Sequence, residues 1–152
     1  MPNIFKAMVP DRVFDKFENI PFKQVFSEGK TCLFLDYDNT IGPDRTWEPT
    51  EYSIEQIKQL KKIGFSLCLV SNAKSERSSG IAKKLDIPCV TYARKPRTDG
   101  IERALQMMNV DRSTVVMIGD QVFTDVIAGN LANMTTFLVE KYQKKEERHY
   151  MI

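Results

Sequence analysis

Short apolar runs recur along the chain, and segments with helical spacing lie between them. The runs are nearly continuous in Val, Ile, Leu and Phe, which is typical of strands covered on both faces. They are residues 31–35, 66–70, 88–91, 114–118 and, with a weaker pattern, 135–139. Apolar positions at helical spacing fill residues 53–63, 76–85, 99–108 and 122–131. This alternation predicts a three-layer αβα, Rossmann-like fold with a mainly parallel sheet of about five strands.

The two ends of the chain differ from this alternating region. Residues 1–28 are rich in Met, Val and Phe, and we expect a helical segment packed on or beside the core. A second interpretation is an amphipathic surface that docks on a bilayer or a partner. Residues 141–152 are mostly charged and predict a solvated tail. Residues 29–140 then form one α/β core, since a chain of 152 residues suits a single domain.

Charge, cysteine usage and hydropathy argue against several classes of protein. The formal net charge of +2 argues against nucleic acid as a main partner. The three cysteines lie in apolar runs without metal-ligand spacing, which favours buried thiols in a reducing compartment. The only histidine, His149, lies in the tail, which argues against a catalytic triad or a histidine-ligated zinc site. No apolar run approaches the length of a bilayer span, and residues 1–27 lack an uninterrupted signal-peptide core. We therefore expect a cytoplasmic protein, with peripheral contact at the inner face of a membrane left open.

Polar side chains follow each of the first four expected strands, at the point where the strand ends. In chain order they are Asp36, Asp38 and Thr40, then Ser71 and Asn72, then Lys95 and Arg97, and finally Asp120, Thr124 and Asp125. In an open parallel sheet, ligands bind beyond the carboxyl ends of the strands. We therefore expect these side chains to share one site.

The residue types at this edge favour phosphoryl transfer. Crowded carboxylates repel each other unless a hard cation neutralises them, and Mg²⁺ prefers oxygen ligands and phosphate. A carboxylate can attack phosphorus to form an aspartyl-phosphate, and a second acid two residues on can protonate the leaving oxygen. Lysine and hydroxyl groups can hold the phosphoryl oxygens as charge shifts in the transition state.

In order and spacing, these residues resemble the four motifs of the haloacid dehalogenase superfamily. The matching positions are Asp36, Asp38 and Thr40 (D-x-D-x-T), Ser71, Lys95, and Gly119, Asp120, Thr124 and Asp125 (G-D-x-x-x-[ST]-D in its short form). The resemblance covers residues 30–139. It implies that Asp36 is the nucleophile and that Asp38 is first the general acid and then the general base. It also implies that Ser71 and Lys95 bind the phosphate.

The same resemblance implies a magnesium site. Mg²⁺ would be held by the Asp36 side chain, the Asp38 backbone carbonyl and Asp120. Asp125 would support the metal or orient Lys95. Further substrate contacts are expected from Thr40, Asn72 and Arg97. Lys74 and Arg77, which follow Ser71, have two open interpretations, a solvated surface charge or a substrate contact.

Finer features resemble the YqeG branch of subclass III, which is related to phosphatidylglycerophosphate phosphatases. They are V-P-D-x-V-F-D before the first strand, V-S-N at Ser71 and K-P-R at Lys95. Only 30 residues separate Thr40 from Ser71, so no cap domain fits there, and an open site suits a large or membrane-surface phosphate. At Gly42 the sequence departs from the aliphatic residues that usually follow the threonine.

The function that we expect is Mg²⁺-dependent phosphomonoester hydrolysis through an aspartyl-phosphate, with phosphatidylglycerophosphate or another membrane-surface phosphate as a candidate substrate. One alternative is a phosphatase of the same fold that acts on a soluble phosphosugar, a nucleotide or a phosphoprotein. Two further alternatives are not enzymes. They are a receiver module that is phosphorylated at an aspartate without turning over, and a scaffold whose apolar N-terminus recruits a partner.

Overall fold

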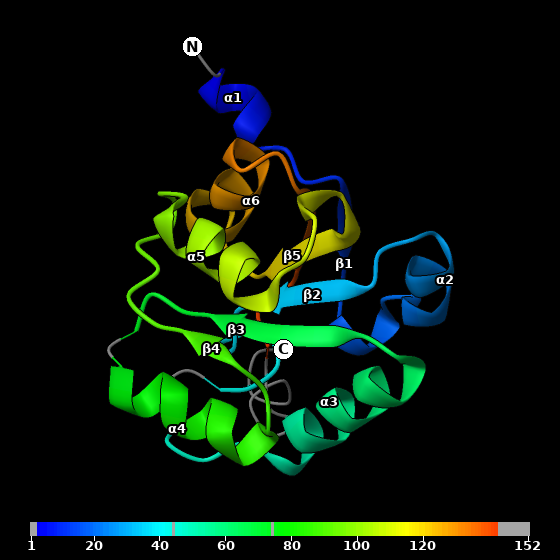
Figure 1. Ribbon diagram of the computed structural model, residues 1–152, viewed down its shortest axis with the longest axis vertical. Coiled ribbons are helices and arrows are strands. Elements are labelled where there is room, and N and C mark those ends of the chain that lie inside the picture. Colours follow the sequence, from blue (N-terminus) through cyan, green and yellow to red (C-terminus); the bar gives the residue numbers. More distant parts are fainter. Residues whose placement is uncertain (1–2, 44, 74, 143–152) are drawn as a thin grey trace, which may run out of the picture.

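One six-stranded parallel sheet forms the centre of the protein (Figure 1). The structure is a computed structural model, and it describes residues 3–43, 45–73 and 75–142. The strands are β1 (Arg12–Phe14), β2 (Cys32–Leu35), β3 (Ser66–Val70), β4 (Cys89–Val90), β5 (Val115–Gly119) and β6 (Thr135–Val139). Their order across the sheet is β1-β6-β5-β2-β3-β4, so β2 lies at the centre, between β5 and β3.

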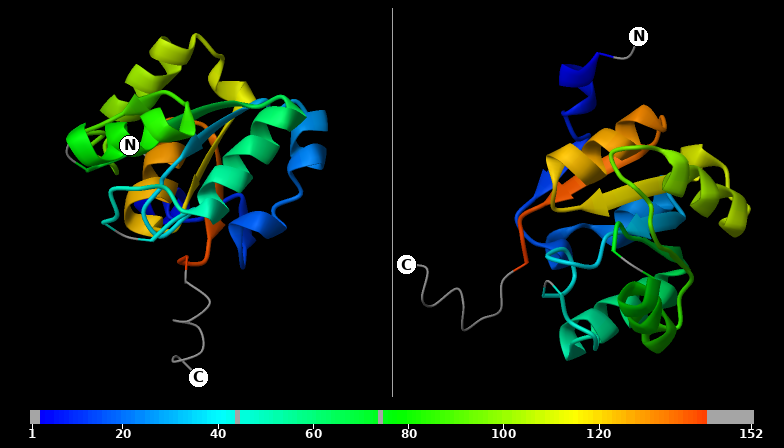
Figure 2. Two further views of the ribbon diagram at one scale, coloured as in Figure 1. Left: turned by 90° about the horizontal axis from the view of Figure 1, so that it is seen from below. Right: turned by 90° about the vertical axis from the view of Figure 1, so that its left-hand side faces the viewer.

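Helices cover both faces of this sheet (Figures 1 and 2). The helical elements are α1 (Ile4–Ala7), η1 (Phe17–Asn19), α2 (Phe22–Ser27), α3 (Glu51–Ile63), α4 (Ser75–Leu85), α5 (Asp99–Met108), η2 (Arg112–Thr114), η3 (Val122–Val126) and α6 (Ile127–Leu131). Helices α2, α3 and α4 lie on one face, α5 and α6 lie on the other, and α1 projects at one end of the molecule (Figure 1). The expected αβα layers are therefore confirmed. Among the described residues, no helix is both long and apolar enough to cross a bilayer.

The central strand β2 contributes to two hydrophobic cores, one on each face of the sheet. Leu33 and Leu35 join the core that includes residues of α2, α3 and α4. Cys32 and Phe34 join the core formed with residues of α5 and α6. Because successive side chains of a strand point to opposite faces, both cores need apolar residues at consecutive positions. This is why the strand is a continuous apolar run in the sequence.

The sheet has one strand more than the sequence analysis expected. Strand β1 comes from residues 1–28, where the hydrophobic pattern suggested only helix, and it pairs with β6 at the edge of the sheet. The Asp11 carboxylate accepts a hydrogen bond from the Thr136 backbone N–H at 2.8 Å, which fixes the start of this pairing. Strand β1 has only three residues and pairs with a single neighbouring strand. A segment this short shows no hydrophobic period, so the sequence did not predict the strand.

A second difference lies at residues 122–131, which the spacing predicted as one helix. The first five residues form a π-helix, η3, and only the following five are α-helical. Such wide turns are frequent at functional sites, and η3 contains Asp125. The expected tail lies outside the described residues from residue 143 on, as do His149 and Lys74.

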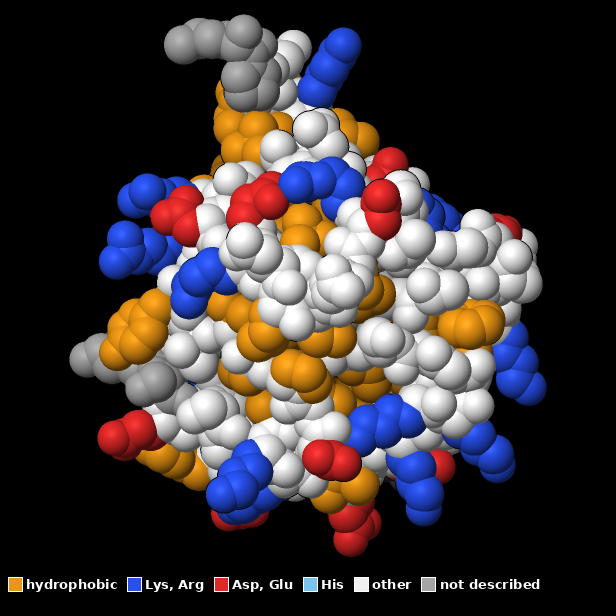
Figure 3. Space-filling model, in the orientation of Figure 1, with side chains coloured by type: hydrophobic (Ala, Val, Ile, Leu, Met, Phe, Trp, Pro, Cys, Tyr) orange, Lys and Arg blue, Asp and Glu red, His pale blue; other side chains and the backbone are white. Residues whose placement is uncertain are grey.

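Charged side chains of both signs surround the face seen in Figure 3, and hydrophobic side chains gather near its middle. The mixture agrees with the small net charge of +2.

Candidate active site

Asp36 lies directly after β2, at the carboxyl end of the central strand. Its backbone N–H donates to Ile118 O of β5 at 3.1 Å, so its position is fixed by the sheet. Its side chain is 17% exposed, and the Asp36 Oδ1 atom lies 3.5 Å from Lys95 Nζ. The residue is therefore partly open to an incoming group while its backbone is held rigidly.

Three carboxylates converge at this point. Asp36, Asp120 and Asp125 each offer an oxygen atom, and these atoms lie within 4.8 Å of one another. Burial raises the pKa of Asp36 well above its usual value, and Asp125 and Asp120 add to the rise while Lys95 opposes it. Burial, reinforced by Asp125, also raises the pKa of Asp120. Oxygen ligands crowded in this way fit a hard divalent cation such as Mg²⁺, which would relieve the repulsion.

Lys95 and Asp125 form a buried ion pair beside this cluster. The Lys95 Nζ and Asp125 Oδ1 atoms are 2.5 Å apart, and the two side chains are 2% and 1% exposed. Burial alone would lower the pKa of Lys95, but Asp125 and Asp36 more than offset it and raise the pKa. The ammonium group is therefore charged at neutral pH and faces Asp36.

Gly119 gives Asp125 the space for this contact. A Cβ atom at residue 119 would lie 2.1 Å from Asp125 Oδ2. Any larger residue at the end of β5 would push the carboxylate away from Lys95. The glycine that opens the fourth motif thus has a steric role.

Asn72 holds the backbone of Lys95. Its side-chain Nδ2 donates to Lys95 O at 2.9 Å, and its Oδ1 accepts from Lys95 N at 2.8 Å. Both ends of its amide thus position the lysine, and the substrate contact expected from the sequence stays a prediction. The residue still lines the cavity described below.

Ser71 and Thr40 are buried polar residues at the same edge. The Ser71 Oγ atom accepts from Ala73 N at 3.0 Å and lies 2.8 Å from Ser78 Oγ. The Thr40 hydroxyl donates to Asp120 Oδ1 at 3.2 Å. Thr40 therefore orients a candidate metal ligand, whereas the sequence analysis expected a phosphate contact.

Asp38 faces a guanidinium group from α4. Arg77 donates to Asp38 Oδ1 at 2.8 Å and to Asp38 Oδ2 at 2.6 Å, and it also donates to Thr46 O at 3.4 Å. The pair is partly buried, with 17% of the Arg77 side chain and 23% of the Asp38 side chain exposed. Arg77 is therefore not a solvated surface charge but lies beside the site, and its contact with substrate stays a prediction.

Tyr37 points away from the site and anchors the loop that carries Asp36 and Asp38. Its hydroxyl lies 3.2 Å from Ser53 Oγ and accepts from Thr50 N at 3.4 Å, at the start of α3. A Cβ atom at Gly42 would lie 2.3 Å from the Tyr37 ring. The tyrosine ring thus occupies the space next to residue 42, which explains why glycine stands there.

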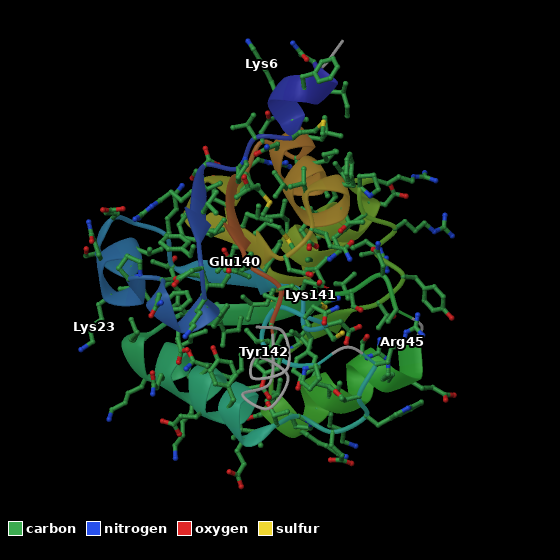
Figure 4. The ribbon with its side chains drawn as sticks, turned by 180° about the vertical axis from the view of Figure 1, so that it is seen from behind. Lys6, Lys23, Arg45, Glu140, Lys141 and Tyr142 are labelled. Carbon is green, nitrogen blue, oxygen red and sulfur yellow. The ribbon has the colours of Figure 1, made fainter. Side chains whose placement is uncertain are left out.

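The same loop is held from the other side by the end of the described chain. The Tyr142 N–H donates to Asn39 O at 2.5 Å, and the Tyr142 and Tyr52 rings are 5.5 Å apart. Figure 4 shows Tyr142 with Glu140 and Lys141 along this segment.

These groups surround a polar cavity of about 290 Å³. Its lining residues are Asp36, Asp38, Asn39, Arg45, Ser71, Asn72, Ala73, Lys95, Gln121 and Thr124. The structure does not bring Arg97 to it, because that side chain is 65% exposed and pairs with Asp99 at 3.2 Å. The sequence analysis missed Arg45 and Gln121, whose only signal is that they lie close to the first and fourth motifs.

Comparison with known proteins identifies the family. The sequence model of the haloacid dehalogenase-like hydrolases matches residues 11–133, which is most of the chain. The chain belongs to the haloacid dehalogenase-like hydrolase family. The family resemblance of the four motifs is thereby confirmed.

Two relatives agree with this family, and one solved structure shares the fold. Probable phosphatase YqeG of Bacillus subtilis (strain 168) is 30% identical over 134 residues, which cover 88% of this chain and 78% of that protein. Phosphatidylglycerophosphate phosphatase 1 of Arabidopsis thaliana is 24% identical over 131 residues, which cover 79% of this chain but 37% of that protein. An uncharacterized protein from Listeria monocytogenes serotype 4b shares the fold, with a TM-score of 0.60, 15% identity, and coverage of 76% of this chain and 84% of that chain. The expectation of a haloacid dehalogenase-type phosphatase is confirmed at this level.

Proposed function

We propose that this protein hydrolyses phosphomonoesters through a covalent aspartyl-phosphate on Asp36. The observation that carries the proposal is the arrangement around Asp36. A partly exposed carboxylate at a strand end faces the ammonium group of Lys95 at 3.5 Å, and a second acid, Asp38, lines the same cavity. Nucleophile, cation and proton donor are the groups that phosphoryl transfer requires.

The reaction proceeds in two in-line steps. In the first step, an Asp36 carboxylate oxygen bonds to phosphorus while the bond from phosphorus to the ester oxygen breaks, and Asp38 gives its proton to the leaving alkoxide. In the second step, Asp38 takes a proton from water, the hydroxide bonds to phosphorus, and the bond to Asp36 breaks. The products are an alcohol and inorganic phosphate, and both carboxyl groups return to their starting state.

The remaining residues bind the phosphoryl group and hold the machinery in place. Lys95 compensates the charge on the phosphoryl oxygens, and the Ser71 hydroxyl, which lines the cavity, donates to one of them. A divalent cation such as Mg²⁺, held by Asp36, Asp120 and the Asp38 carbonyl, supplies further charge neutralisation when bound. Asp125 keeps the Lys95 ammonium group aimed at the nucleophile, since its carboxylate is 2.5 Å away.

The substrate that we propose is a phosphate on a large molecule at a membrane surface, with phosphatidylglycerophosphate as the first candidate. The name of the relative from Arabidopsis thaliana supports this candidate. Two aromatic side chains support contact with such a surface. Trp47, in the segment after the first motif, is 61% exposed, and Phe123, within the fourth motif, is 68% exposed. Amphipathic aromatic rings such as that of tryptophan are enriched where a protein meets a bilayer. We further propose that the protein is cytoplasmic and makes peripheral contact with such a surface.

The test is a phosphate-release assay on the wild type and on Asp36→Asn, with Mg²⁺ and with EDTA. Asp36→Asn removes the nucleophile and is expected to reduce turnover by at least about 1,000-fold. Asp99→Asn is the matched control, because Asp99 is an exposed carboxylate outside the cavity. Full activity of Asp36→Asn in Mg²⁺ would contradict the mechanism.

A substrate panel separates the remaining alternatives. Preference for phosphatidylglycerophosphate in mixed vesicles over soluble esters supports the membrane-surface substrate, whereas preference for a phosphosugar, a nucleotide or a phosphoprotein supports the soluble alternative. A phosphoprotein that persists for hours after exposure to a small phosphoryl donor would indicate a receiver module. A stable complex from cell extract, together with no metal-dependent turnover, would indicate a scaffold.

A further inference from the structure

Arg77 lies next to the cavity, in contact with Asp38, which lines it. In an in-line reaction at Asp36, the ester oxygen departs on the side opposite to the nucleophile, and Asp38 must contact that oxygen to protonate it. A group in direct contact with the Asp38 carboxylate therefore lies next to the leaving group. Arg77 makes this contact with two hydrogen bonds of 2.8 and 2.6 Å.

The position of Arg77 is not explained by its own helix. Residue 77 lies in the first turn of α4, where the partial positive charge of the helix N-terminus disfavours a cation. The side chain extends instead to the loop that follows β2, where it binds Asp38 and the Thr46 carbonyl. The guanidinium group is thus held at the site by the motif loop.

A second guanidinium group stands on the same side. Arg45 lines the cavity from the loop after β2, with a left-handed backbone at φ 58°. Figure 4 shows Arg45 on the side of the molecule where α4 begins. Lys95, by contrast, is paired with Asp125 and Asp36 on the phosphoryl side. Two guanidinium groups therefore lie near Asp38, in the lining of the cavity or directly behind it, whereas the Lys95 ammonium group lies near Asp36.

We propose that Arg77 determines specificity by binding a second anionic group of the substrate, so that the preferred substrates are phosphomonoesters whose leaving group carries a carboxylate or a phosphate. A guanidinium fork binds carboxylate and phosphate oxygens in the same two-bond geometry. A substrate anion can therefore replace Asp38 on Arg77, which leaves the Asp38 carboxyl free to contact the leaving oxygen. This inference rests on the proposed phosphatase function, because it needs Asp38 beside the leaving group.

The experiment compares three esters that share a carbon skeleton. Glycerol phosphate has a neutral leaving group, whereas phosphoglycerate and glycerol bisphosphate carry a second anion on it. The readout is the ratio of kcat/KM for each anionic ester to kcat/KM for glycerol phosphate, because general damage to the enzyme cancels in this ratio. The wild type is expected to prefer the anionic esters. In Arg77→Gln the ratio is expected to fall about 10- to 100-fold, mainly through KM, since two charge-assisted hydrogen bonds are lost. Arg77→Lys keeps the positive charge but lacks the two-pronged guanidinium geometry. Its ratio is expected to lie between those of the wild type and Arg77→Gln.

Arg112→Gln is the matched control. Arg112 makes the same pattern of contacts far from the cavity, with two hydrogen bonds of 2.8 Å to Glu102 and one to a backbone carbonyl, that of Ala132. Its substitution is expected to leave the ratio unchanged. Melting temperatures of all variants show that the compared proteins are folded.

Two different results overturn two different statements. If turnover depends on Asp36 but the ratio is the same in Arg77→Gln and the wild type, or if the wild type shows no preference, Arg77 does not select substrates. If no ester is turned over in an Asp36-dependent manner, the proposed function fails. Binding of phosphoglycerate and glycerol phosphate to Asp36→Asn, measured by calorimetry with Mg²⁺, then gives the same comparison, and equal affinities with and without Arg77→Gln would overturn the inference.

Discussion

The buried pair of Lys95 and Asp125 gives a stability prediction that does not depend on activity. Lys95→Met removes the cation that lies 2.5 Å from Asp125 and 3.5 Å from Asp36, whose carboxylates are 1% and 17% exposed. Breaking a buried ion pair from one side costs about 3–5 kcal/mol, because the remaining charge has no partner. For a chain of 152 residues, each kcal/mol lowers the melting temperature by about 2–4 °C, so the expected loss is about 6–20 °C.

The double substitution Lys95→Met with Asp125→Asn tests the origin of this loss. Removing both partners of a buried pair is often close to neutral, so the double variant is expected to recover at least half of the stability that Lys95→Met loses. The surface control is Lys84→Met, which removes an exposed pair with Glu48 and is expected to cost no more than about 1 kcal/mol.

The measurement is urea and thermal unfolding followed by circular dichroism, in EDTA at neutral pH. The pKa of Lys95 is raised in the folded protein, so the stability that the pair contributes is fully present below the usual lysine pKa and is lost only as the pH rises through the raised value. Neutral pH therefore reports the whole effect. The reasoning is refuted if Lys95→Met is within about 1 kcal/mol of the wild type, or if the double variant is no more stable than Lys95→Met.

Two further predictions concern the acidic cluster and the glycine beside it. Asp120→Asn removes one of three carboxylates that lie within 4.8 Å, so its melting temperature in EDTA should equal or exceed that of the wild type. Adding Mg²⁺ at 100 times its Kd should raise the free energy of unfolding of the wild type by about 2.7 kcal/mol. The same addition should leave the stability of Asp120→Asn unchanged, and an equal rise in this variant would contradict the metal site. Gly119→Ala places a methyl group 2.1 Å from Asp125 Oδ2 and should destabilise the protein by about 1–3 kcal/mol and reduce turnover at least about tenfold. Gly80→Ala in α4 has nothing within 4 Å of the new methyl group and should stabilise by about 0.5–1 kcal/mol, so equal losses in both variants would refute the steric argument.

The sequence predicted the strands that are continuous apolar runs, the helices with regular apolar spacing, and the positions at which the strands end. Strands β2 to β6 and the carboxylates after them follow from this pattern, because buried parallel strands require continuous apolar runs. The roles of Thr40 and Asn72 do not follow from it. Their contact with substrate stays a prediction, and the structure adds that Thr40 bonds to Asp120 and Asn72 to the Lys95 backbone. Which polar partner a side chain selects depends on distances across strands that a pattern along the chain does not contain.

The contact between Arg77 and Asp38 could not be predicted from the sequence either. In the sequence it is one of many basic residues near a helix start, where a solvated charge is the ordinary outcome. Its partner Asp38 is 39 residues earlier in the chain, and only the parallel order of β2 and β3 brings the two together.

The hydroxyl of Tyr37 links the catalytic loop to the first turn of α3. Thr50 caps this helix through its bond to Ser53 N, and the same two residues hold the tyrosine hydroxyl. Helix ends fray before helix centres open, and the opening of such an end is a local event that leaves the rest of the fold intact. In this protein, fraying at residue 50 would release the peptide between the two acids of the first motif. Opening of this helix cap would therefore loosen one of the contacts that hold Asp36 and Asp38 in their relative positions.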